Sequence, residues 1–368
     1  MAVRIGVVRE TAAGERRTAL TPETCAKLIK AGAEVVVERG LGVAAYFPDA
    51  AYQAAGAELA DDAAAVLAEA DVLFAVQPPA NAQIAQLKPG AVLIGGIQPE
   101  ADPARADALR ERGIVVFPLE RLPRTTRAQS MDVLSSQAGM AGYKATLIAA
   151  ELAPRFFPML TTAAGTIRPS KVLIVGAGVA GLQAVATAKR LGAQVEGFDV
   201  RPETREQIES LGGKFLDLGV SAAGEGGYAR ALTEEEHAEQ QRRLGEHLKS
   251  VDVIICTAAV PGRPAPKIIS AEMVAMMRPG SVIVDLAAET GGNCALTVPG
   301  QSIETDNGVS VAGPLDLASM GALHASEMYA RNVFNFASLL ITTDGLNLDW
   351  DDELLAKTVW PPRADPAR

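Results

Sequence analysis

The sequence predicts an α/β protein built from two doubly wound domains with a cleft between them. Its 368 residues exceed the roughly 100–200 residues of a typical domain, so two cores of ordinary size are expected. Apolar, strand-like runs alternate with helical patterns, and a second such series opens at Lys171. This alternation is typical of parallel sheets covered by helices on both faces. We expect one domain to comprise residues 1–132 and 316–368, and the other residues 133–315.

The composition indicates a soluble globular protein. Hydrophobic residues make up 48% of the chain and charged residues 21%, which are ordinary proportions. A net charge of −10 without a visible lysine and arginine cluster argues against nucleic acid as a partner. The longest weakly polar run, Val172 to Ala188, falls short of the ~20 apolar residues of a membrane-spanning helix. Cys25, Cys256 and Cys294 lie far apart without metal-ligand spacing, so we expect no metal site and a reduced, cytosolic chain.

The first series contains five strand-like runs, at residues 3–8, 34–38, 71–76, 90–96 and 113–119. After the first run, Thr21 is a candidate N-cap, Pro22 suits a first helical turn and Gly32 suits a stop. These signals predict a helix over residues 22–31. A long helix from Val133 to about Phe157 is expected to link the two domains.

The second series contains six strand-like runs, at residues 171–177, 194–200, 213–219, 251–259, 281–289 and 308–314. Six is the strand count of a complete doubly wound domain. The helix and acidic tail after Pro314 are expected to return to the first domain. An insert over residues 219–250 joins a glycine-rich stretch to a highly charged helix, and the glycine-rich part is expected to be mobile. An ordinary surface excursion is the alternative.

Gly176, Gly178 and Gly181 have the G-x-G-x-x-G spacing between a predicted strand and a predicted helix. In that context the first glycine permits a tight turn, the second lets a pyrophosphate approach the backbone, and the third lets helix pack on strand. Asp199 ends the next strand, where a carboxylate can accept both ribose hydroxyls and repel a 2′-phosphate. The pattern predicts a Rossmann-like domain that prefers NAD(H) to NADP(H), a preference that Arg201 tempers. Glycines that serve packing alone are the alternative.

No residue stands out as a proton donor for catalysis. A dehydrogenase that reduces a carbonyl needs a general acid such as His or Lys, because a proton moves with the hydride. His237 and His247 fall in the charged helix and are expected to be solvated, and His324 falls in the late helix. Hydride exchange between two nicotinamide rings moves no proton. A site without an acid or base therefore suits a hydride donor to a second dinucleotide.

With these residues in view, the whole chain resembles the NAD(H)-binding component, domain I or the α1 subunit, of proton-translocating NAD(P) transhydrogenases. The family carries a specific Arg-x4-Gln-x2-Asp loop beside the nicotinamide, which matches Arg124, Gln129 and Asp132. The stretches that carry the resemblance are RETAAGERRTALTPE, LPRTTRAQSMDVLSSQAGMAGYKA, GAGVAGLQAVATAKRLGA, ESLGGKF and MRPGSVIVDLAAETGGNC.

The resemblance assigns roles to two groups of residues. Those expected to be catalytic are Arg124, Gln129, Asp132, Ser135 and Tyr143. Those expected to bind the cofactor are Gly176, Gly178, Val179, Ala180, Gly181, Asp199, Val200, Arg201, Gly227 and Tyr228, the last two in a mobile loop that closes over the nucleotide. Arg124 and Asp132 can pair to hold their loop, while Gln129 can bond a ribose or carboxamide and reach toward a second nucleotide. A solvated loop residue is the alternative for Gln129.

The resemblance also implies an activity and partners. The chain is expected to bind NADH and pass hydride directly to NADP⁺ on a separate subunit. A membrane subunit is expected to form a proton channel and to couple this transfer to proton translocation. A homodimer is implied as well, cytoplasmic and peripheral to the inner membrane through its partner subunits.

Two other functions stay open at this stage. One is a stand-alone alanine or amino-acid dehydrogenase, since that enzyme resembles domain I in fold and in the N-terminal stretch. It uses a lysine and a histidine to bind and protonate the keto acid, and here Gln77 stands where the lysine would be, with no histidine nearby. Arg17 matches its substrate-binding arginine. The other is a non-catalytic NAD-binding module.

Overall fold

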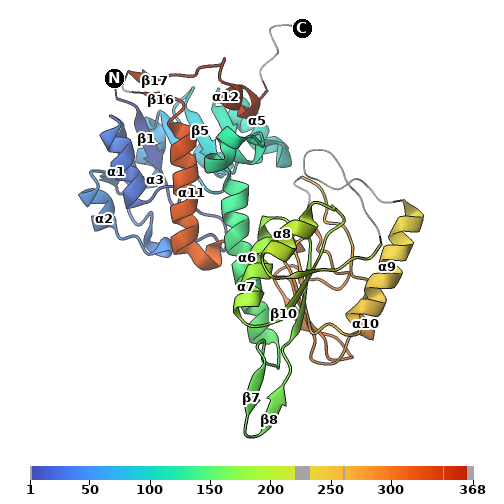
Figure 1. Ribbon diagram of the computed structural model, residues 1–368. Helices are drawn as coiled ribbons and strands as arrows, with labels where there is room; N and C mark the ends of the chain where they lie inside the picture. Colours follow the sequence, from blue (N-terminus) through green and yellow to red (C-terminus); the bar gives the residue numbers. More distant parts are fainter. Residues whose placement is uncertain (1, 220–232, 260–261, 343, 363–368) are drawn as a thin grey trace. The chain divides into compact units, whose positions relative to one another are not determined.

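The computed structural model describes residues 2–219, 233–259, 262–342 and 344–362 (Figure 1). The chain divides into two compact units. The first comprises residues 1–137 and 318–368, and the second comprises residues 138–317. Each unit contains its own parallel sheet and its own core.

The first unit contains a six-stranded parallel sheet of order β3-β2-β1-β4-β5-β6. Its strands are β1 (Arg4–Val7), β2 (Glu34–Glu38), β3 (Glu58–Ala60), β4 (Val72–Ala75), β5 (Val92–Gly95) and β6 (Val115–Pro118). The strand order reverses direction between β1 and β4. In a doubly wound sheet the carboxyl edge at this switch point is the usual place for a ligand.

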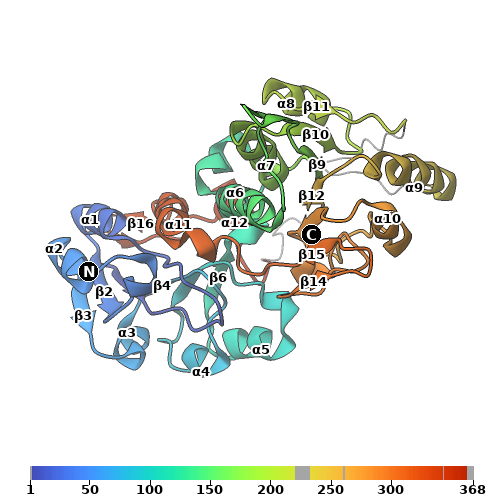
Figure 2. The same ribbon diagram turned by 90° about the horizontal axis from the view of Figure 1, so that it is seen from below.

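Helices cover both faces of this sheet (Figure 2). Its helices are α1 (Pro22–Lys30), α2 (Asp49–Ala54), α3 (Ala63–Glu69), α4 (Asn81–Ile84), α5 (Pro103–Glu111), α11 (Ala322–Ala337) and α12 (Glu353–Thr358). One core joins α1 and α11 to one face, and a second core joins α3, α4 and α5 to the other. Successive side chains of β4 alternate between them, since Val72 and Phe74 lie in the first core and Leu73 in the second.

The second unit contains a seven-stranded sheet of order β11-β10-β9-β12-β13-β15-β14. All pairs are parallel except β14 with β15. Its strands are β9 (Lys171–Val175), β10 (Gln194–Phe198), β11 (Lys214–Phe215), β12 (Val253–Cys256), β13 (Val282–Asp285), β14 (Ser302–Glu304) and β15 (Ser310–Ala312). Here the switch point lies between β9 and β12.

Helices also sandwich the second sheet. They are α7 (Val179–Arg190), α8 (Thr204–Ser210), α9 (Glu234–Leu248) and α10 (Ala271–Met276), together with the later turns of α6 (Val133–Leu152). One core contains residues of α6 and α7, and the opposite core contains residues of α9 and α10. The predicted fold class, an α/β protein with two Rossmann-like doubly wound domains, is confirmed.

Local signals placed α1 correctly. The Thr21 hydroxyl accepts the Thr24 N–H, Pro22 occupies the first turn, and Gly32 follows the helix with a φ of 97°. The linking helix is shorter than expected, because α6 ends at Leu152 rather than near Phe157. Pro154 cannot continue a helical hydrogen-bond ladder.

Several short strands were missed by the sequence analysis. They are β3 and β14 at the sheet edges, the hairpin of β7 (Leu160–Thr162) and β8 (Gly165–Ile167), and the hairpin of β16 (Ile341–Thr342) and β17 (Gly345–Leu346). Figure 1 shows β7 and β8 projecting beyond α6. Strands of two or three residues carry too little alternation to be recognised from pattern alone.

Tyr329 of α11 ties the two central carboxyl ends of the first sheet together. Its buried hydroxyl donates to the Ala75 carbonyl at 2.8 Å and accepts the Gly96 N–H at 3.0 Å. Tyr329→Phe leaves both backbone groups without this partner, so we expect a loss of about 1–3 kcal/mol in the free energy of unfolding. Urea titration measures it. Tyr46→Phe, at a residue 68% exposed, is the control, and equal stability of the two variants would contradict the assignment.

Candidate functional site

The turn after β9 has the geometry of a dinucleotide-binding turn. Gly176 has a φ of 94°, which L side chains rarely adopt, and its N–H donates to the Phe198 carbonyl at 2.8 Å. Gly178 is the N-cap of α7, and nothing lies within 4 Å of the position that a Cβ would occupy there. The first N–H groups of α7 have no partner within the helix and carry its positive dipole end. An anionic group can therefore reach the backbone at Gly178.

Gly181 serves a different purpose. A Cβ on Gly181 would lie 1.9 Å from the Gly176 carbonyl oxygen and 2.9 Å from the Thr257 hydroxyl. Helix α7 thus approaches the turn more closely than any side chain would allow. The three glycines of the motif give a sharp turn, an open approach and a close packing contact.

Asp199, which follows β10, anchors the same turn. Its Oδ2 accepts the Ala177 N–H at 2.7 Å, so the carboxylate joins the end of β10 to the turn after β9. Arg201 holds the remaining acceptor positions: its N–H and Nε donate to Oδ1 at 2.9 Å each, and Nη2 donates to Oδ2 at 2.7 Å. A carboxylate offers about four acceptor positions, and all four are engaged here. A ribose diol that bonds Asp199 therefore has to displace part of the Arg201 guanidinium.

Asp199 is ionised at neutral pH. Burial opposes ionisation, but the hydrogen bonds from Arg201 and from the Ala177 N–H lower the pKa of this carboxyl below its ordinary value. A charged carboxylate at this place disfavours a 2′-phosphate. The adjacent guanidinium weakens that repulsion, as the sequence suggested.

The other expected site residues of the second unit lie near this turn or outside the described residues. Val179 and Ala180 begin α7, and Val200 lies between Asp199 and Arg201. Tyr143 is 40% exposed on α6 and follows Gly142, where a Cβ would lie only 2.0 Å from the Ala180 carbonyl oxygen. Helix α6 therefore contacts the first turn of α7 beside Tyr143. Gly227 and Tyr228 fall in residues 220–232, outside the stretches of chain that the structure describes.

The remaining expected catalytic residues belong to the first unit. Arg124 and Gln129 are exposed, Gln129 within the 3-10 turn Thr126–Met131. Asp132 caps helix α6: its Oδ1 accepts the Ser135 N–H at 2.9 Å, and its Oδ2 accepts the Ser135 hydroxyl at 2.5 Å. Asp132 and Ser135 thus have a local structural role that the sequence analysis did not anticipate.

Two residues of α11 that the sequence analysis missed hold the turn that carries Gln129. The side-chain amides of Asn332 and Asn335 donate to the Ser130 carbonyl at 2.8 and 2.9 Å. The Asn332 Oδ1 also accepts the Ser136 hydroxyl at 2.7 Å. Two asparagines one helical turn apart on a largely apolar helix were the available signal. They attach both sides of the Gln129 segment to one helix.

The carboxyl edge of the first sheet holds a closed cluster of polar side chains around Glu15. The Glu15 carboxylate accepts two bonds from the Arg17 guanidinium, Nε at 2.8 Å and Nη2 at 2.5 Å. It also accepts the Gln77 amide at 2.8 Å and the Ser319 hydroxyl at 2.5 Å. Arg17 Nη1 donates to the Gln137 side chain at 3.0 Å. Arg17, whose role was open, is therefore paired internally.

Two carboxyl groups in this cluster have opposite pKa shifts. Burial raises the pKa of Glu10 to about 7, although the N–H groups of Val76 and Gln77 donate to it at 2.6 and 3.1 Å. Burial also acts on Glu15, but the hydrogen bonds and charge of Arg17 lower its pKa to about 2. Glu10 links the ends of β1 and β4, at the switch point of the first sheet.

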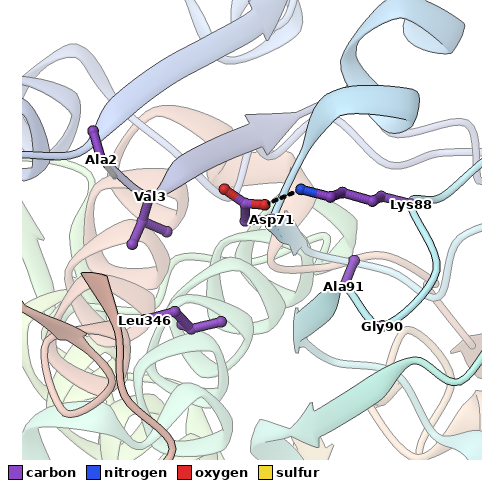
Figure 3. A pocket seen from close by; sticks show the side chains of 7 residues that line it. All are labelled: Ala2, Val3, Asp71, Lys88, Gly90, Ala91 and Leu346. Carbon is purple, nitrogen blue, oxygen red and sulfur yellow. Dashed lines mark hydrogen bonds and ion pairs between the residues drawn. The ribbon is translucent and has the colours of Figure 1, made fainter. Parts of the chain in front are cut away.

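Two surface hollows lie at the opposite, amino edges of the sheets. Figure 3 shows one of about 220 Å³ in the first unit, where Asp71 and Lys88 form an ion pair near Val3 and Leu346. The other, of about 390 Å³, borders the first residues of β9, β10 and β11 in the second unit. Neither contains the glycine turn or the Glu15 cluster, so we place the chemistry at the carboxyl edges, where parallel sheets bind ligands.

The histidines lie away from these edges. His237 and His324 are exposed, as expected. The prediction for His247 was wrong, because it is only 22% exposed and its Nε2 lies 2.6 Å from Glu196 Oε2 on β10. Among the described residues, no helix is long and apolar enough to cross a membrane.

The turn, the helix N-terminus and Asp199 define a dinucleotide-binding protein with a Rossmann-like domain. The alanine dehydrogenase/PNT family profiles match this chain at residues 6–141 for the N-terminal domain and 145–362 for the C-terminal domain. The first of the chains that make up NAD(P) transhydrogenase subunit alpha in Rhodospirillum rubrum is 44% identical over 367 residues, covering 97% of this chain and 95% of the relative.

Solved structures agree with that relationship. A transhydrogenase structure from Sinorhizobium meliloti has a TM-score of 0.87 at 41% identity and covers 97% of each chain. An L-alanine dehydrogenase structure has a TM-score of 0.80 at 25% identity and covers 97% of this chain and 94% of the other. The chain belongs to the alanine dehydrogenase/PNT family, and within it to the alpha subunits of NAD(P) transhydrogenase.

Gly178 and Gly181 provide a paired test of the dinucleotide turn. Gly178→Val enters open space, so the fold should persist with at most about 1 kcal/mol lost at the helix cap. NADH affinity should fall at least ~100-fold, because the side chain blocks the approach of the pyrophosphate. Gly181→Ala should instead lower the melting temperature. Calorimetric titration and circular dichroism measure both, and unimpaired NADH binding by Gly178→Val would place the ligand elsewhere.

Glu10 should make stability depend on pH. Because its folded pKa, about 7, exceeds the ordinary value of 4.5, the folded chain keeps a proton that the unfolded chain loses. Stability is therefore full below pH 4.5 and decreases by about 3 kcal/mol as the pH rises to about 7. Glu10→Gln should remove this slope, whereas Glu111→Gln at an exposed position should retain it. Chemical denaturation at several pH values gives the slope, and a flat wild-type profile would refute the titration.

Proposed function

We infer that this chain acts as the NAD(H)-binding component of a proton-translocating NAD(P) transhydrogenase. In this function NADH bound to the second unit passes hydride directly to NADP⁺ on a partner subunit. A membrane subunit couples the transfer to proton translocation. The similarity over nearly the whole chain to a transhydrogenase alpha-subunit chain supports this activity.

The observation that carries the proposal is the engagement of every polar group in the Glu15 cluster. Arg17 and Gln77 both bond Glu15, and both oxygens of Glu10 accept backbone N–H groups. None of these groups is presented as a proton donor to a carbonyl substrate. Hydride exchange between two nicotinamides needs no such donor, whereas reduction of a keto acid does.

The residues divide the work between binding and positioning. The turn at Gly178 and the N-terminus of α7 would receive the pyrophosphate, and Asp199 with Arg201 would receive the ribose of the adenosine half. The nicotinamide rings supply the hydride chemistry. Gln129 offers an uncharged amide with donor and acceptor, so it can orient a nucleotide without exchanging a proton. Asn332 and Asn335 would keep its turn in place.

An amino-acid dehydrogenase is the second candidate, because a solved L-alanine dehydrogenase shares the fold. It predicts oxidation of NADH by the isolated chain in the presence of pyruvate and ammonia. Transhydrogenation predicts no such turnover and predicts transfer only after an NADP(H)-binding subunit is added. The two assays together separate these functions from a non-catalytic NAD-binding module.

The proposal extends to assembly and location. We place the chain in the cytoplasm as a homodimer, held at the inner membrane through its NADP(H)-binding and membrane partner subunits. Sedimentation of the isolated chain tests the dimer. Co-purification with membranes that contain the partner subunits tests the association.

Gln129→Ala should separate transfer from binding. Ring-to-ring transfer needs the reacting atoms at roughly 3–3.5 Å, and a misplacement of ~1 Å costs about 10²-fold in rate. We expect NADH affinity within a few-fold of wild type and hydride transfer at least ~100-fold slower. Stopped-flow transfer from NADH to an NADP⁺ analogue on the reconstituted complex measures the rate.

Gln86→Ala is the matched control, because Gln86 is an exposed glutamine of the first unit near its amino edge. It should transfer hydride at the wild-type rate. A normal rate in Gln129→Ala would remove Gln129 from the site. A normal rate with weakened NADH binding would leave it as an anchor only.

A further inference from the structure

The chain segment that leaves β12 braces the dinucleotide turn from the side opposite Asp199. The Thr257 hydroxyl donates to the Gly176 carbonyl at 2.8 Å. The same hydroxyl would lie 2.9 Å from a Cβ on Gly181, so it fills the space that both glycines leave. The N–H of Ala258, the next residue, would lie 2.9 Å from a Cβ on Gly176. The position of Thr257 and Ala258 therefore sets the position of the turn.

Asn293 holds this segment with its entire side-chain amide. Its Oδ1 accepts the Ala258 N–H at 3.0 Å, and its Nδ2 donates to the Ala258 carbonyl at 2.8 Å. Nδ2 also donates to the Pro266 carbonyl at 2.9 Å, so one side chain joins the two ends of the segment from Ala258 to Pro266. Asn293 is completely buried. A buried amide with all these bonds made is costly to replace.

Asn293 is itself fixed from β13. The buried Asp285 at the end of that strand accepts the Cys294 N–H at 2.9 Å and the Thr297 hydroxyl at 2.6 Å. The Asn293 carbonyl accepts the N–H groups of Ile268 and Ile269 at 2.8 and 3.0 Å. A continuous set of hydrogen bonds thus runs from β13 through Asn293 to the end of β12.

The strand order tells which half of a dinucleotide this arrangement faces. The switch point lies between β9 and β12, and a dinucleotide lies across it. Asp199 follows β10, on one side of β9, and marks the adenosine half. The turn at Gly178 takes the pyrophosphate. The nicotinamide half therefore falls on the other side, over the carboxyl end of β12, where Thr257 and Ala258 lie.

We propose that Asn293 is a positioning residue for the nicotinamide half of NAD(H), acting through Ala258 and Thr257. This proposal rests on the proposed function and deepens it. Asn293 does not touch the nucleotide. It sets the backbone at the end of β12, and so the height and angle at which the nicotinamide ring is held.

The test compares two ligands in two variants. Asn293→Ala removes the amide, and Asn293→Asp keeps its size and the acceptor for Ala258 but lacks both donors. We expect NADH affinity, measured by calorimetric titration, to fall about 10-fold or more in each. Affinity for ADP, which has the adenosine and pyrophosphate but no nicotinamide, should stay within about two-fold. The rate of hydride transfer at saturating NADH should fall as well.

Asn307→Ala is the matched control, since Asn307 also donates to backbone carbonyls of the second unit, at Val274 and Met277 beyond the dinucleotide edge. It should bind both ligands as wild type does. Unchanged NADH affinity in a folded Asn293 variant overturns the proposal, and so does an equal loss for NADH and ADP, which indicates general damage to the turn.

Thr257→Val keeps the proposal testable if both Asn293 variants fail to fold, because it removes only the hydroxyl contact to Gly176. It should lower NADH affinity more than it lowers ADP affinity, and equal affinities would again overturn the proposal. Thr187→Val, which loses a hydroxyl bonded within α7, is its control. A wild-type chain that binds neither nucleotide would instead contradict the proposed function.

Discussion

The close approach of helix α7 to the turn after β9 is the constraint on which the dinucleotide site depends. A Cβ on Gly181 would overlap the Gly176 carbonyl, so the helix can reach this position only without a side chain there. The approach aims the N-terminus of α7 at the open backbone of Gly178. It also brings the turn within reach of Asp199 on one side and Thr257 on the other. Each later contact in the second unit assumes this geometry.

Charge is balanced internally at both carboxyl edges. In the second unit Arg201 surrounds Asp199, and in the first unit Arg17 surrounds Glu15. Both carboxylates keep a low pKa despite burial, because a bidentate guanidinium offsets the cost of removing them from water. The consequences differ. Asp199 faces a ligand turn and must exchange partners when a ribose binds, whereas Glu15 belongs to a closed cluster that leaves no group for proton transfer.

Much of the fold could be predicted because its signals are local. Strand and helix periodicity located the central strands of both sheets, and the glycine spacing located the turn at Gly176. The short edge strands β3 and β14 escaped, since three residues carry no measurable alternation. The helical tie between Asn332 and Ser130 also escaped, because it joins residues 202 positions apart. His247 was misjudged for the same reason, since its partner Glu196 lies on a different element.

The sequence by itself determined the fold class, the number of domains, the dinucleotide turn and the family. These depend on residue type and spacing along one stretch of chain, where sterics and hydrogen bonding act between near neighbours. Only the tertiary structure decided how the polar groups are used. It paired Arg17 with Glu15, surrounded Asp199 with Arg201, made Asp132 a helix cap, and placed Asn293 against Ala258. A side chain's partner depends on which distant backbone the packed core brings within about 3 Å, and no pattern of neighbouring residues encodes that distance.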